Sequence, residues 1–163
     1  MPASSPTDEQ LRDRVLEQTW AGDFLQAQQT ARGILDRQYL QQAWVGMLCI
    51  HRERGDVQGI KETIAACPDD SLLESQEYME LPLEFIRTGD ISGAVEIANA
   101  MGRYGKFSLT LLPVSLAGKG DFVGARKAAS QITDERTRNG IMKMVDQLQA
   151  EQKNTGPEES NPK

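Results

Sequence analysis

A Gly-Asp pair recurs four times along the chain, and its spacing constrains the fold more than any other feature. The pairs are 33, 34 and 31 residues apart and stand at Gly22-Asp23, Gly55-Asp56, Gly89-Asp90 and Gly120-Asp121. A near-constant period of this length is typical of supersecondary units that stack on their neighbours. Glycine adopts the left-handed conformation just past a helix end, and aspartate accepts hydrogen bonds from the first turn of the next helix. Each pair therefore predicts a tight turn between two antiparallel helices.

The segments after the turns share one apolar face. Apolar or small residues recur one, four, eight and eleven positions after each Asp, as in Phe122, Ala125, Ala129 and Ile132. This spacing follows the helical period and predicts four second helices with small residues at mid-face. Gly59, Gly93 and Gly124 stand three positions after their Asp. Because a first-turn glycine weakens a helix, its recurrence predicts a close contact there.

The segments before the turns carry a second fixed register, eleven, eight and four residues upstream of each Gly. In the last three units these positions hold Trp44, Met47 and His51, then Tyr78, Leu81 and Phe85, then Leu109, Leu112 and Leu116. The first unit has Leu11, Arg14 and Gln18, a weaker core that suits a terminal repeat. We predict a first helix over 8–21 and a capping box at Ser71–Glu74 that begins the third unit. A ninth helix is predicted over 135–150, capping the open end.

Composition limits the class of protein. The 163 residues, 39% apolar and 26% charged, suffice for one core, so we predict a repeat domain over 8–150 between disordered ends at 1–7 and 151–163. The net charge of −6 disfavours nucleic-acid binding, despite local basic spots. No apolar run is long enough for a membrane span and no leader precedes residue 8, so we predict a cytoplasmic protein without membrane contact. Cys49 and Cys67 are predicted to be small, buried, apolar residues in a reducing compartment.

In this register the chain resembles a tetratricopeptide repeat array. The resemblance covers about residues 9–150 and rests on an early aromatic, a Leu one turn later, an aromatic before the turn, the Gly-Asp turn and a following Ala, as in Tyr78, Leu81, Phe85, Gly89-Asp90 and Ala94. The small residue expected after the first-helix Leu is instead Leu48, Pro82 and Pro113. The resemblance implies an all-α fold, a right-handed α-solenoid of about four antiparallel helix pairs plus a C-terminal capping helix. It also implies a protein-interaction role.

In arrays of this family the first helices line a concave groove that holds a peptide or helix of a partner protein. Carried over by register, the resemblance implies a partner-binding face formed by Val45, Arg52, Met79, Leu83, Ile86, Arg87, Phe107 and Val114. An apolar groove of this kind is typical of a binding site. Two alternatives stay open: the helix over 135–150 fills the groove, or strong curvature buries these residues as core.

Other functions have weaker sequence support. Self-association through terminal repeats is the second hypothesis, with Trp20 as a candidate contact and a monomer or weak homo-oligomer as the expected state. His51, the one histidine, occupies a core position, and Cys49 does not share its helix face, so no metal or nucleophile–base pair is predicted. The sequence contains no phosphate-binding loop or paired-Cys motif. We therefore expect neither a cofactor nor enzymatic activity. Glu77, Glu80 and Glu84 share a face that is predicted to be solvated.

Overall fold

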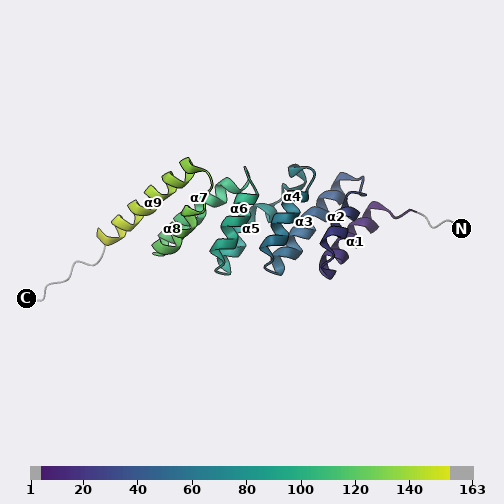
Figure 1. Ribbon diagram of the computed structural model, residues 1–163, viewed down its shortest axis with the longest axis horizontal. Helices are drawn as coiled ribbons and strands as arrows, with labels where there is room; N and C mark the ends of the chain where they lie inside the picture. Colours follow the sequence, from purple (N-terminus) through teal and green to yellow (C-terminus); the bar gives the residue numbers. More distant parts are fainter. Residues whose placement is uncertain (1–4, 155–163) are drawn as a thin grey trace, which may run out of the picture. The chain divides into compact units, whose positions relative to one another are not determined.

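The computed structural model describes residues 5–154, and this part of the chain is all-α, with nine α-helices, one short 3₁₀ helix and no strand. This confirms the all-α part of the predicted fold class. The chain divides into two compact units with a boundary between Phe85 and Ile86. Each unit is described by itself below (Figure 1).

The first unit is built from helical hairpins. It contains α1 (Asp8–Ala21), α2 (Phe24–Ala31), α3 (Arg37–Glu53), α4 (Val57–Ala66), the 3₁₀ helix η1 (Asp70–Leu73) and most of α5 (Gln76–Arg87). Helix α1 packs against both α2 and α3, and α3 packs against α4 and η1. The second unit contains α6 (Ile91–Ala100), α7 (Gly105–Gly118), α8 (Phe122–Ser130) and α9 (Glu135–Asn154). Helix α7 packs against α6, α8 and α9.

The four Gly-Asp turns have the predicted backbone conformation. Their glycines have φ values of 90°, 65°, 88° and 84°, which lie in the left-handed region. Asp56, Asp90 and Asp121 each accept a hydrogen bond from the backbone N–H of the glycine three residues later, at 2.8, 2.9 and 2.8 Å. Asp23 makes no such side-chain bond, and the residue three positions after it is Gln26.

The close contact predicted at the first-turn glycines is with the capping carboxylate. A Cβ atom on Gly124 would clash with the Asp121 side chain, and one on Gly59 would clash with both Asp56 and His51. The absent side chain therefore makes room for the carboxylate that its own N–H binds. Asp and Gly together form one capping device, which explains why they recur as a set.

The predicted register describes the core. All nine first-helix core positions of the last three units are buried, as are both mid-face positions of every second helix. In the first unit Arg14 is exposed and Gln18 is half-buried, and Val15 and Thr19 are buried instead. The core stripe of α1 is thus rotated by one residue relative to the other first helices.

Two local features differ from the sequence-based expectation. Ser71–Glu74 does not begin α5: it overlaps the 3₁₀ helix η1, whose first turn is capped by Asp69. The Ser75 hydroxyl instead accepts a hydrogen bond from the Tyr78 N–H at 3.1 Å at the start of α5. Helix α9 continues to Asn154, four residues past the expected end, and residues 155–163 lie outside the described part. Helices α5 and α7 run without interruption through Pro82 and Pro113, both buried.

Candidate functional site

The predicted partner-binding face lies at the surface. None of its eight residues is buried: Met79, Arg87 and Phe107 are exposed, and Val45, Arg52, Leu83, Ile86 and Val114 are half-buried. The alternative in which curvature turns this face into core is therefore not observed. The eight residues are divided between the two units, so the structure offers one candidate surface in each.

The first unit contains a pocket on the predicted face of α3. Its volume is about 440 Å³, within the range of roughly 300–1,000 Å³ that ligand pockets occupy. Val45 is one of its lining residues. The others are Gln38, Gln41, Gln42, Gly46 and Cys49 from α3, with Ser75 and Glu77 from the start of α5. The pocket therefore has an apolar floor bordered by side-chain amides and one carboxylate.

Hydrogen bonds between α3 and the segment before α5 hold the pocket walls. The Arg37 guanidinium pairs with Asp69 at 3.2 Å and donates to the Ser71 hydroxyl at 2.5 Å. The Gln41 side-chain amide donates to the Glu74 carbonyl at 3.3 Å. Asp36 caps α3 by accepting from the N–H groups of Gln38 and Tyr39. These contacts link α3 to the segment that precedes α5.

The pocket's chemistry favours binding through amides rather than attack by a thiolate. Burial raises the pKa of the Cys49 thiol above its ordinary value, an effect that nearby Arg52 partly offsets. A thiol with a raised pKa is protonated at neutral pH and is a weak nucleophile. The Gln38 side-chain amide offers donors and an acceptor, which suits the backbone of a bound peptide. The Gln41 amide already donates to the Glu74 carbonyl, and the Gln42 side-chain oxygen accepts from Arg12.

The second unit presents apolar side chains on the outer face of α7. Phe107 is 66% exposed, Leu111 is 38% exposed and Val114 is half-buried. Their spacing of i, i+4 and i+7 places them on one side of the helix. We call these three residues the α7 stripe. The opposite side of the helix already belongs to the core through Leu109, Leu112 and Leu116. The outer face of α7 is therefore apolar although the core packs only against the opposite face.

The C-terminal helix packs beside α7 without covering the α7 stripe. Ile141 and Val145 of α9 are buried, and Arg126 of α8 donates hydrogen bonds to Asp146, at 2.8 Å, and to Gln149. Phe107 nevertheless keeps two-thirds of its surface exposed. Within the described residues of the second unit, α9 therefore leaves Phe107 and Leu111 exposed.

Leu111 is the residue of this surface that sequence reasoning missed. It lies one helical turn after Phe107, at a position that the register carried over from the family does not select. The helical period counted from Phe107 itself is the signal that finds it. Trp20, the other exposed aromatic considered, is partly covered, because the Arg54 guanidinium lies 5.3 Å from the centre of its ring and donates to its carbonyl.

His51 occupies the core position that its register predicts. It is 1% exposed, its Nδ1 atom lies 2.8 Å from the Asp56 carboxylate, and its ring centroid lies 4.3 Å from that of Phe24. The same carboxylate accepts from the Gly59 N–H. The histidine therefore ties the end of α3 to the cap of α4.

The described residues contain neither a metal-binding cluster nor a membrane-spanning helix. Among residues 5–154, no group of three or more His, Cys, Asp or Glu side chains is arranged to hold a metal ion. No helix in the same range is long and apolar enough to cross a membrane. Cys49 and Cys67 are both free thiols and half-buried. No protein-family model, curated protein or solved structure matches the chain.

Proposed function

We propose that this protein is a protein–protein interaction module of the tetratricopeptide type, in which the face of the first helices holds a peptide or helix of a partner protein. The observation that carries the proposal is α7, whose core side is buried while its outer side exposes Phe107 and Leu111. Contiguous apolar side chains on a surface are typical of interaction sites. The amide-rich pocket on α3 supports the same role in the first unit.

The proposal includes an arrangement of the repeats. In it the four helix pairs stack as a right-handed α-solenoid, with α9 as the C-terminal cap. The first helices then form one concave surface, from Val45 and Arg52 through Met79, Leu83, Ile86 and Arg87 to Phe107 and Val114. The protein acts by binding, without a catalytic role or cofactor, in the cytoplasm and independently of nucleic acid or membrane.

Matched charge substitutions test the proposal. Phe107→Glu places a carboxylate on the α7 stripe, and Val123→Glu places one on α8 at a residue that is 81% exposed. Both side chains are largely in water, so each substitution should change stability by less than about 0.5 kcal/mol. Proteins that bind each form are captured from the native host and quantified. We expect the wild type and Val123→Glu to capture the same partner proteins and Phe107→Glu to lose them. Equal capture by all three would contradict the proposal.

Self-association is a second candidate, because Leu25 on α2 is 71% exposed and Trp20 on α1 is 51% exposed in the first hairpin. Light scattering after size exclusion distinguishes it from partner binding. A concentration-dependent dimer that Leu25→Glu dissociates supports self-association through the first repeat. A monomer at high concentration rules it out.

A further inference from the structure

The second unit carries a basic stripe beside its apolar one. Ile141 and Val145 are the buried pair of α9, four residues apart like Leu112 and Leu116 of α7. Arg136 and Lys143 stand five residues before and two residues after Ile141, and both are exposed. Phe107 and Val114 stand at the same distances from Leu112. Arg136 and Lys143 are thus the α9 equivalents of the α7 stripe, and we call them the α9 stripe.

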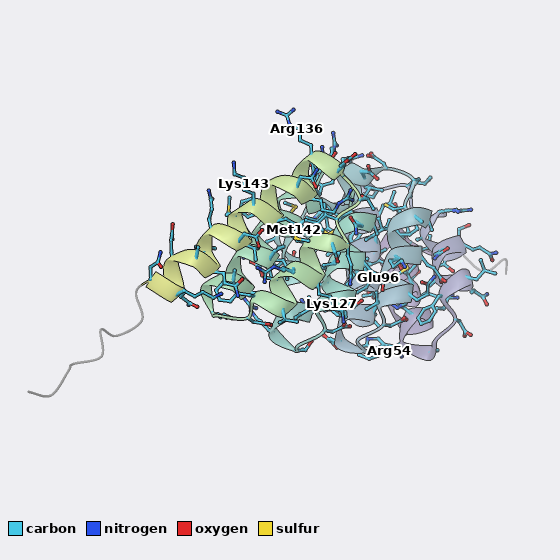
Figure 2. All side chains as sticks on the ribbon, turned by 60° about the vertical axis from the view of Figure 1, so that its left-hand side comes forward. Arg54, Glu96, Lys127, Arg136, Met142 and Lys143 are labelled. Carbon is cyan, nitrogen blue, oxygen red and sulfur yellow. The ribbon has the colours of Figure 1, made fainter. Side chains whose placement is uncertain are left out.

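The two stripes lie on neighbouring helices of the second unit. Helices α7 and α9 pack against each other. The positive charges of Lys106 on α7 and Arg136 on α9 both help to lower the pKa of Asp134, after the larger effect of its hydrogen bonds to Thr137. Each helix buries equivalent positions, and the two stripes occupy equivalent positions on the side away from them. Figure 2 shows Arg136 and Lys143 projecting together from α9, apart from Lys127 on α8.

The acidic groups near the α9 stripe are engaged or directed elsewhere. Asp134 accepts a hydrogen bond from the Thr137 N–H at 2.8 Å and caps the helix. Asp146 is paired with Arg126 of α8 at 2.8 Å. Glu135 precedes Arg136 by one residue and so points about 100° away around the helix. The α7 stripe is therefore apolar, and the α9 stripe on the neighbouring helix is positive.

We infer that the two stripes form one face and that this face binds an acidic amphipathic helix of a partner protein, whose apolar side lies on the α7 stripe and whose acidic flank faces the α9 stripe. The inference rests on the proposed function and adds the chemistry of the partner. Apolar anchors at i, i+4 and i+7 match the spacing of the α7 stripe. Arg136 and Lys143 are seven residues apart, or about 10 Å along the helix axis, so acids two turns apart face both. The charges select the partner and orient it along the groove.

A displayed peptide library provides the test. The library consists of amphipathic helices with Leu fixed at i, i+4 and i+7 and with flanking positions drawn from Glu, Lys, Gln and Ser, and it is selected against the full chain. Enriched peptides are then titrated by fluorescence anisotropy. The test variant is Arg136→Glu/Lys143→Glu, and the control Lys119→Glu/Lys127→Glu changes net charge equally on other surfaces. Each variant is checked for an unchanged circular dichroism spectrum.

We expect enriched peptides to carry Glu on one flank. Their affinity should fall at least about tenfold with the test variant, because two attractive pairs become repulsive, and less than about twofold with the control. Enriched peptides with neutral or basic flanks, or equal losses in both variants, overturn the inference but leave the proposed function standing if Phe107→Glu still abolishes binding. Failure to enrich any peptide sensitive to Phe107→Glu overturns both. Tighter binding of a short single-stranded RNA through Arg136 and Lys143 also overturns the inference.

Discussion

Because of the Asp–Gly capping device, we expect a glycine-to-alanine substitution in α8 not to stabilise the protein, although this substitution usually stabilises a helix. Replacing glycine by alanine inside a helix ordinarily stabilises it, by about 0.5–1 kcal/mol. At Gly124 the new methyl group would occupy the space of the Asp121 carboxylate. The carboxylate must then leave the Gly124 N–H that it accepts from at 2.8 Å. Gly124→Ala is therefore expected to be neutral or destabilising.

The magnitude follows from two opposing contributions. Losing an N-cap hydrogen bond costs about 1 kcal/mol, which matches or exceeds the gain in helix propensity. Gly140 in α9 is the matched control, because it is exposed and an added Cβ atom would meet nothing within 4 Å. Gly140→Ala should stabilise by about 0.5–1 kcal/mol. The two variants should thus differ by about 1 kcal/mol, the contribution of the lost cap.

Urea denaturation of a double-mutant cycle measures this directly. In an Asp121→Ala background no carboxylate is displaced, so Gly124→Ala should stabilise about as much as Gly140→Ala does. The coupling between the two positions should be about 1 kcal/mol. Equal stabilisation by Gly124→Ala and Gly140→Ala in the wild-type background, or a coupling near zero, would refute the reasoning.

Three further predictions concern buried and half-buried groups. His51→Ala should destabilise the chain by about 3 kcal/mol in urea melts, because it removes a buried ring together with its Asp56 contact, and a loss below about 1 kcal/mol would contradict this role. Gly105→Ala should lower the free energy of unfolding by about 2 kcal/mol, because its Cβ atom would overlap the Ala98 backbone. Gly118→Ala on the same helix is the control, because its Cβ atom would meet nothing within 4 Å. Equal free energies of unfolding for the two variants would disprove the close approach at Gly105. Burial raises the pKa of Cys67 to about 11, so its alkylation at pH 8 should be roughly 100-fold slower than in the unfolded chain and should rise tenfold per pH unit. A rate that is flat between pH 8 and 10 would argue against the raised pKa.

Long-range sequence periodicity predicted most of the fold. The Gly-Asp spacing located the turn within each of the four helical hairpins. The register counted from these turns identified buried residues as different as His51, Tyr78 and Ala129. This worked because the turn sets the phase of both flanking helices, and the helical period then determines which side faces the core. The register failed in α1, where Val15 and Thr19 replace Arg14 and Gln18. A terminal helix contacts fewer neighbours, so its orientation is less constrained by them.

Local signals were less reliable than the period. Ser71 and Glu74 have the spacing of a capping box, yet the Asp69 carboxylate binds the Ser71 N–H at 2.9 Å and favours a 3₁₀ turn there. The pocket beside α3 was only partly predictable, because its walls depend on tertiary contacts of Arg37 and Gln41. The α9 stripe can be recognised only once the buried side of α9 is known. The sequence indicated that side through Ile141 and Val145 but did not indicate a role for the opposite side.

Site-specific photo-crosslinking tests the central claim, that the face of the first helices holds a partner protein. A benzophenone side chain is introduced at Phe107, and in a separate variant at Val123, which is more exposed but lies on α8. The account predicts a discrete adduct with another polypeptide at position 107 and none at 123, after irradiation in the native host. Adducts of equal yield at both positions, or a position-107 adduct absent while partners are still captured, would contradict it.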